Sequence, residues 1–137
     1  MEVYYSAKER INRPIFWIDV MGQYGHLFTA SMVFDGLSPR SIEGDGVMRC
    51  RFKRVTMLPQ TYSITIRARG PNGTDVLAPT VSEACYFHVS GSAAEYSMDG
   101  ELASNHLDHD SPMLVPYEWI YEDGTSAQPS WQIFKNQ

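Results

Sequence analysis

The chain has 137 residues, of which 43% are apolar and 12% aromatic, which suffices for the core of one domain and argues against a disordered protein. Its formal net charge is −5, from 11 basic and 16 acidic residues, so nonspecific attraction to nucleic acid or an anionic membrane is disfavoured. Two cysteines provide neither a disulfide framework nor a zinc ligand set, and no apolar run approaches a membrane span. With no signal-peptide pattern at the start, we expect a reducing, cytoplasmic setting.

Three strands are predicted in the first third of the chain. The first covers residues 2–7, and the second covers residues 14–21, where nearly every side chain is apolar and both faces are expected to be covered. A glycine-bearing turn at residues 22–25 leads to a third strand at 26–34, either as a hairpin or by crossing to the opposite sheet. Residues 35–45 contain Gly, Pro and Ser and are expected to form a loop.

Residues 47–69 carry the clearest β pattern, a strand, a tight corner and a further strand. Apolar and polar side chains alternate on both sides of the corner, through residue 53 before it and from Tyr62 after it. A period of two predicts a sheet with one buried and one solvated face. In the corner, Pro59 fixes the turn and Tyr62 starts the next strand, as at the corner of a β-sandwich.

The second half of the chain contains two more predicted strands. Residues 83–89 alternate as a sixth strand, and a small, polar and acidic connector follows, with a loose turn of helix. A last apolar strand is expected at residues 113–121, where Pro116 cannot donate to a ladder. Such a strand lies at a sheet edge or pairs with another chain.

These elements predict an all-β fold, an immunoglobulin-like or jelly-roll antiparallel β-sandwich of about seven strands with a C-terminal edge or swapped strand. We expect residues 1–91 to form the sandwich core and residues 92–110 a polar connector. Residues 111–137 are expected to be a terminal strand and tail, within the same domain or exchanged in a dimer. Cys50 and Cys85 fall on the apolar sides of their strands and are expected to be buried, reduced thiols.

Five short motifs follow one another between residues 3 and 119. They are Gly44-x-Gly46, Met57-Leu58-Pro59-x-x-Tyr62-x-Ile64-x-Ile66, Asn72-Gly73, Phe87-x-Val89-Ser90-Gly91 and Val115-Pro116-x-x-Trp119. In this order they resemble the C-terminal carbohydrate-binding domain of the ATP-binding subunit of O-antigen polysaccharide ABC exporters, the Wzt type. No Gly-x-x-x-x-Gly-Lys-Ser/Thr phosphate loop occurs in the sequence, so the ATPase half of such a subunit is not in this chain.

The resemblance implies a noncatalytic β-sandwich of lipopolysaccharide biosynthesis that recognises the capped, non-reducing end of an O-antigen polysaccharide before export. It implies three partners: the glycan, a second copy that exchanges the terminal strand, and the other subunits of the ABC transporter. The implied location is cytoplasmic, at the inner face of the membrane, without membrane insertion. We expect no nucleic-acid partner.

A carbohydrate site needs aromatic rings and fixed polar groups on a shallow surface, which the outward side chains of a sheet provide. If the fifth and sixth strands form a hairpin and the second strand joins their sheet, seven outward residues share one face. The predicted carbohydrate-binding residues are Ser63, Thr65, Arg67, Tyr86, His88, Trp17 and Asp19. The alternative is an ordinary solvated face, with Arg67 in a cross-strand salt bridge and Trp17 packed under a loop.

No catalytic residue, metal or cofactor is predicted. His106, Asp108, His109 and Asp110 are metal-ligand types, but they lie in a polar loop without a second ligand pair at a defined spacing. No Gly-x-Ser-x-Gly nucleophile motif is present. Two alternatives to carbohydrate binding stay open: a protein interaction or oligomerisation module, and a metal-dependent hydrolase that uses this loop.

Overall fold

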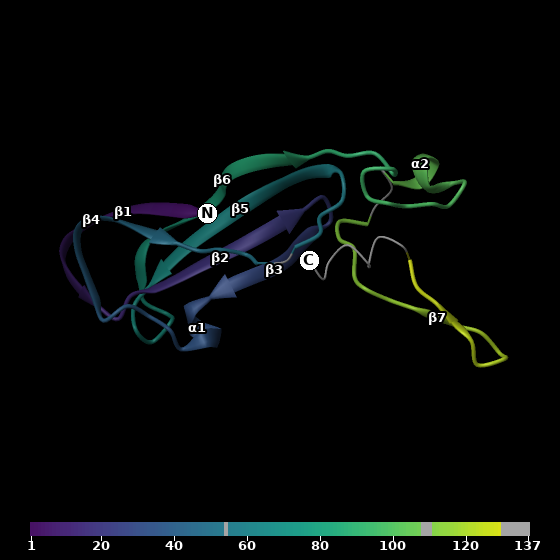
Figure 1. Ribbon diagram of the computed structural model, residues 1–137. Helices are drawn as coiled ribbons and strands as arrows, with labels where there is room; N and C mark the ends of the chain where they lie inside the picture. The colour runs from purple at the N-terminus through teal and green to yellow at the C-terminus, as the bar shows by residue number, and fades with distance from the viewer. Residues whose placement is uncertain (54, 108–110, 130–137) are drawn as a thin grey trace. The chain divides into compact units, whose positions relative to one another are not determined.

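The computed structural model describes residues 1–53, 55–107 and 111–129 (Figure 1). Over these ranges the regular structure is eight strands and two four-residue helices, which confirms the expected all-β fold. In chain order the elements are β1 (Glu2–Asn12), β2 (Ile15–Gly22), β3 (Gly25–Ser31), α1 (Met32–Asp35), β4 (Ser41–Arg49), β5 (Gln60–Arg69), β6 (Val76–Val89), α2 (Ala103–His106), β7 (Trp119–Ile120) and β8 (Ser126–Ala127).

The chain divides into two compact units. The first unit contains Met1–Arg54 and Tyr62–Phe87, and it holds both large antiparallel layers. The second unit contains Val55–Thr61 and His88–Gln137, and it holds α2 and the two-stranded pair β7–β8. The expected tail at the C-terminus lies outside the described residues.

The first unit is a β-sandwich of two antiparallel layers. One layer is the pair β1–β4, and the other is a four-stranded sheet in the order β3-β2-β5-β6 (Figure 1). Along β2, Phe16, Ile18 and Val20 are buried on the face toward β1, where the ring of Tyr5 lies 5.8 Å from that of Phe16. The alternate side chains of the four-stranded sheet therefore point away from the β1–β4 pair, and we call this side the outer face.

Buried apolar side chains of the four-stranded sheet form the centre of the core. Val20 and Ile64 pair directly across β2 and β5, and each is only 1% exposed. Tyr62 is also buried, and its ring stacks on that of Phe87 with centroids 5.3 Å apart. Burial of an aliphatic side chain of this size stabilises a fold by about 1.5–3 kcal/mol relative to full exposure.

Of the two connections that the sequence left open after β2, the structure has the hairpin, and β3 is shorter than expected. The predicted strand at 26–34 ends at Ser31, and α1 follows. The hydroxyl of Ser31 accepts a hydrogen bond from the backbone N–H of Val33 at 3.1 Å, which caps the helix. Gly36, with φ 67°, ends it in the left-handed conformation that glycine adopts without strain.

The β1–β4 pair begins and ends at residues that differ from the prediction. β4 spans Ser41–Arg49, so the loop expected at 35–45 is wrong for residues 41–45. β1 continues to Asn12 because β1 and β4 pair along most of their length. This pairing gives backbone hydrogen-bond partners to the polar end of β1, which has weak strand propensity of its own. Gly44, at φ 67°, bends β4 where a side chain would be strained.

The strand expected to run through residue 53 ends at Arg49. The apolar alternation continues beyond this point for a different reason. Phe52 packs edge-on against Phe28 of β3, with ring centroids 5.0 Å apart. An apolar side chain outside a strand can therefore continue the alternating pattern of the strand, because it too packs against the sheet.

β6 is twice as long as expected and lies at an edge of the four-stranded sheet. It spans Val76–Val89, and every residue except Val89 is exposed. Cys85 is consequently exposed, so the expectation of a buried thiol is wrong there, and Cys50 is only partly buried. Both cysteines are free.

The terminal strand expected at residues 113–121 is wrong in its length. Met113 forms only an isolated bridge, and regular pairing is restricted to Trp119–Ile120 in β7 with Ser126–Ala127 in β8. Pro116 lies between them and has no N–H to donate, so a continuous ladder cannot run through it.

The second unit has a small core of its own. Leu58, Ala93 and Leu107 are buried together, and Leu107 follows α2, which is the helical turn expected in the connector. The Tyr96 hydroxyl donates to the backbone carbonyl of Met57 at 3.0 Å, and burial raises the pKa of Tyr96. This hydrogen bond satisfies a polar group that the small core would otherwise leave without a partner.

Replacing Ile64 by Ala should lower the free energy of unfolding by about 2–5 kcal/mol, because the lost side chain leaves a cavity in the core. Urea denaturation followed by circular dichroism measures this change. The same substitution at Ile120, which is 70% exposed, is the control and should stay within about 0.5 kcal/mol of the parent. Equal losses at both positions would contradict the placement of the core.

Candidate functional site

The centre of the candidate site is the carboxylate of Asp19 on the outer face of the first unit. Its side chain is only 2% exposed, between β3 and β5. One oxygen, Oδ2, lies 2.8 Å from Nη1 of Arg67. The other, Oδ1, accepts a hydrogen bond from the Thr29 hydroxyl at 2.6 Å and lies 2.9 Å from Nε2 of His26. These contacts offset the cost of removing a carboxylate from water.

Arg67 is held on two sides. Its guanidinium carbon lies 5.3 Å from the ring centroid of Trp17, a cation–π contact, while Nη1 binds Asp19. The side chain is still 34% exposed, and within the described residues Asp19 is its only side-chain hydrogen-bonding or ionic partner. A guanidinium has five N–H donors, so most of them remain available to a ligand in a fixed position.

The ring of Trp17 packs against the guanidinium of Arg67 and against a second aromatic ring. The edge of its ring meets Phe34 of α1, with centroids 5.7 Å apart. Its Nε1–H is buried and, among the described residues, has no hydrogen-bond acceptor. Trp17 is itself only partly exposed, and Phe34 beside it is 72% exposed and adds a more accessible ring.

The structure brings five of the seven predicted residues together on the outer face. In the β2–β5 ladder, Trp17 lies opposite Arg67, Asp19 opposite Thr65, and Met21 opposite Ser63. Asp19 and Thr65 are buried, so they support the surface rather than form it. Trp17, Ser63 and Arg67 are partly exposed and form the accessible part.

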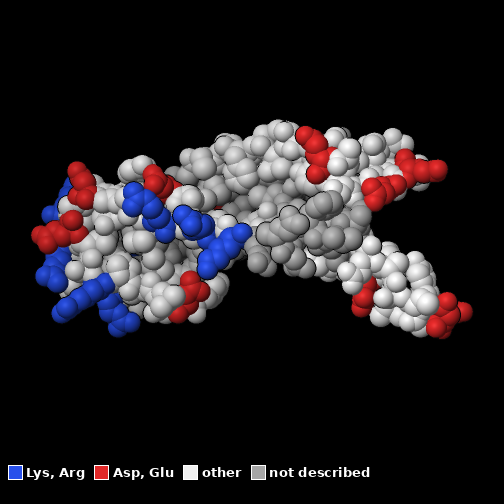
Figure 2. Space-filling model, in the orientation of Figure 1, with Lys and Arg blue, Asp and Glu red and all other residues white. Residues whose placement is uncertain are grey.

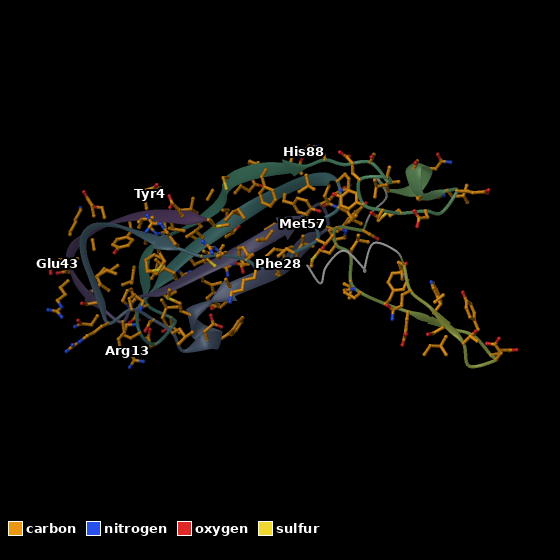
Figure 3. The ribbon with its side chains drawn as sticks, viewed as in Figure 1. Tyr4, Arg13, Phe28, Glu43, Met57 and His88 are labelled. Atoms are coloured by element: carbon orange, nitrogen blue, oxygen red, sulfur yellow. The ribbon has the colours of Figure 1, made fainter. Side chains whose placement is uncertain are left out.

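Tyr86 and His88 of β6 have different positions. Phe87 stacks on the buried ring of Tyr62, so the neighbouring Tyr86 points to the outer face, where it is 59% exposed. A hydrogen bond to the carboxylate of Glu83 raises the pKa of Tyr86. His88 belongs to the second unit, where its Nδ1 lies 3.2 Å from the hydroxyl of Thr61, and it is not included in the candidate site (Figure 3).

Sequence reasoning missed three residues of the site. His26 and Thr29 reach Asp19 through the β2–β3 ladder, in which Asp19 lies opposite Thr29. The register shifts between Val20 and Met21, and this irregularity hid the periodicity of β3. Phe34 was missed because α1 was expected to be strand. The turn at residues 22–25 was the available signal, since a tight hairpin places both strands in one sheet.

No metal site is found in the part of the chain that the structure describes. No group of three His, Cys, Asp or Glu side chains there is arranged to hold an ion. His106 ends α2, whereas Asp108, His109 and Asp110 lie outside the described residues. In the same described ranges, no helix has both the length and the apolar character of a membrane span.

Charge is divided unequally between the two units. The first unit contains ten of the 11 basic residues and eight of the 16 acidic residues, which gives a formal charge of +2. The second contains one basic and eight acidic residues, a formal charge of −7. On the face drawn in Figure 2, the basic side chains of the described residues lie over the first unit.

Replacing Thr29 by Val should reduce the free energy of unfolding by about 1.5–3 kcal/mol, because the buried carboxylate loses a hydrogen bond to a charged group. Thr61→Val is the matched control, since Thr61 is exposed, and should cost less than about 0.5 kcal/mol. Chemical denaturation of both variants measures the difference. Equal stability of the two variants would mean that Asp19 does not depend on Thr29.

The ion pair is tested by a double-mutant cycle. Arg67→Met should destabilise the protein by about 1–3 kcal/mol, because it leaves the Asp19 charge without its cation. In the Asp19→Asn background the same change should cost much less, since no charge remains to be compensated. Additive losses in urea titrations would show that the two side chains are not coupled.

No protein-family model matches the chain, and no curated protein matches it significantly. The resemblance to the exporter domain rests on the five sequence motifs and stays a prediction.

Proposed function

We propose that the outer face of the first unit binds a carbohydrate and that the chain is a noncatalytic binding domain. The single observation that carries this proposal is the guanidinium of Arg67, fixed by the buried Asp19 and by the ring of Trp17 while one third of the side chain stays exposed. Donors that are already in place lose little entropy when a ligand binds. Hydroxyl-rich ligands need such fixed donors.

The surroundings of Arg67 support a sugar as the ligand. Phe34 offers an exposed ring beside Trp17, suited to the apolar face of a pyranose. Ser63 on β5 adds a partly exposed hydroxyl, and Tyr86 on β6 adds both a ring and a hydroxyl. A shallow face that combines aromatic and polar groups is a common form of ligand site.

The sequence motifs supply the biological context of the proposal. The ligand would be the capped, non-reducing end of an O-antigen polysaccharide, and the domain would act with an ABC transporter on the cytoplasmic side of the membrane. A net charge of −5 disfavours nucleic acid as an alternative ligand. Neither a catalytic role nor a cofactor is part of this proposal.

A second function, protein interaction or oligomerisation, is favoured by the terminal segment of the second unit. Large apolar side chains there are exposed to 48–70%, more than scattered surface residues require. They are Val115, Tyr117, Trp119, Ile120 and Tyr121. We propose that this segment contacts a second copy of the chain, so that the two functions are carried by different units.

Arg67→Ala should weaken binding to capped O-antigen polysaccharides at least tenfold, because the fixed donors are lost. Glycan arrays followed by calorimetry on the strongest ligand measure this. Arg10→Ala, at an exposed position of β1, is the matched control and should bind as the parent does. Unchanged binding by the Arg67 variant would place the site elsewhere.

Dimerisation through the terminal segment is tested by sedimentation. The parent chain should sediment as a dimer, and Trp119→Ser should shift it toward the monomer by removing a large apolar contact. Tyr4→Ser, at a residue 76% exposed in the first unit, is the control and should leave the dimer intact. A monomeric parent at micromolar concentration would contradict the proposal.

A further inference from the structure

His26 is the most accessible side chain in contact with Asp19. Its side chain is 52% exposed, whereas that of Asp19 is 2% exposed. Its Nε2 lies 2.9 Å from Oδ1 of Asp19 and 2.6 Å from the hydroxyl oxygen of Thr29. The imidazole is therefore fixed by one nitrogen, at the rim of the candidate site.

The three contacts determine which nitrogen of the neutral ring carries the proton. The Thr29 hydroxyl donates its single hydrogen to Oδ1 of Asp19 at 2.6 Å, so toward His26 it can only accept. The carboxylate oxygen also accepts. Only a proton on Nε2 makes both contacts of His26 attractive, because an unprotonated Nε2 would face two oxygen lone pairs.

This tautomer leaves Nδ1 as an acceptor on the half-exposed ring. Among the described residues, none donates a hydrogen bond to Nδ1. Arg67 binds the other oxygen of the same carboxylate and presents N–H donors. The buried carboxylate of Asp19 thus fixes two groups: His26, which offers an acceptor, and Arg67, which offers donors.

We infer that the ligand of this face is a neutral sugar whose hydroxyl groups both accept and donate hydrogen bonds, and that His26 is a residue that determines this specificity. This inference rests on the proposed carbohydrate-binding function. One hydroxyl can accept from Arg67 while another donates to Nδ1 of His26. An ionised carboxylate has no hydrogen to donate to Nδ1, and its charge meets a lone pair there. Arg67 alone would favour such an anion, so His26 reverses the selection.

The tautomer is tested without any ligand. Nitrogen-15 NMR of the imidazole groups, at a pH high enough for the neutral ring to dominate, should show His26 protonated at Nε2. Thr29→Val should perturb the His26 signals, and Thr61→Val should not. Protonation at Nδ1 would overturn the inference, and it would leave the proposed carbohydrate function standing.

The ligand class is tested on immobilised oligosaccharides of neutral hexoses and on matched oligosaccharides that contain a uronic acid. The parent should prefer the neutral set, and His26→Leu should lose about five- to tenfold in affinity for it, the effect of one hydrogen bond. His26→Gln should lose less, because its amide oxygen can still accept.

The matched control for this substitution is His106→Leu, at an exposed position of α2 in the second unit, which should bind like the parent. Thermal unfolding of each variant establishes that it is folded. Preference for the uronic acid set, or unchanged binding by His26→Leu, would overturn the inference alone. Failure of the parent to bind either set would overturn the inference, and failure to bind capped O-antigen polysaccharides as well would also overturn the proposed function.

Discussion

The structure of the first unit depends on one buried charge. Asp19 is almost completely removed from water, and such a carboxylate is tolerated only where cations and hydrogen-bond donors surround it. The donors come from both neighbouring strands, Thr29 and His26 from β3 and Arg67 from β5. A shift of register by one residue would turn these groups to the other face. The carboxylate therefore specifies the alignment of three strands as well as the chemistry of the surface above it.

The two faces of the four-stranded sheet differ: the inner face contributes to stability, and the outer face carries the site for which we propose ligand binding. The inner face is dry, and its buried residues such as Val20 and Ile64 hold the layers together. The outer face carries the polar network, which is rigid because it is anchored to the same strands. Alternation along β2 and β5 places core and network only one residue apart. The fold thus provides a rigid base for the polar groups of the outer face.

Local patterns were sufficient for part of this arrangement. The alternation after Pro59 predicted β5 and assigned Thr65 and Arg67 to one face, because period two is a property of the strand itself. Pairing partners are not local, so the sequence did not show that Arg67 meets Asp19, or that residues 41–45 join β1 despite their turn-like composition. His26 was missed for a different reason. It is near Asp19 in the sequence, but the register of the β2–β3 hairpin shifts between Val20 and Met21, which hides the β3 side chains that reach Asp19.

The exposure of β6 has a consequence for how the protein avoids self-association. A long edge strand offers unpaired N–H and C=O groups to any other extended chain, and the edge residues of β6 include many apolar side chains. Two residues interrupt this template. Pro79 removes one donor, and Glu83 combines a negative charge with a left-handed backbone at φ 52°. They divide β6 into residues 76–78, 80–82 and 84–89, so that another extended chain meets three short templates in place of one long edge.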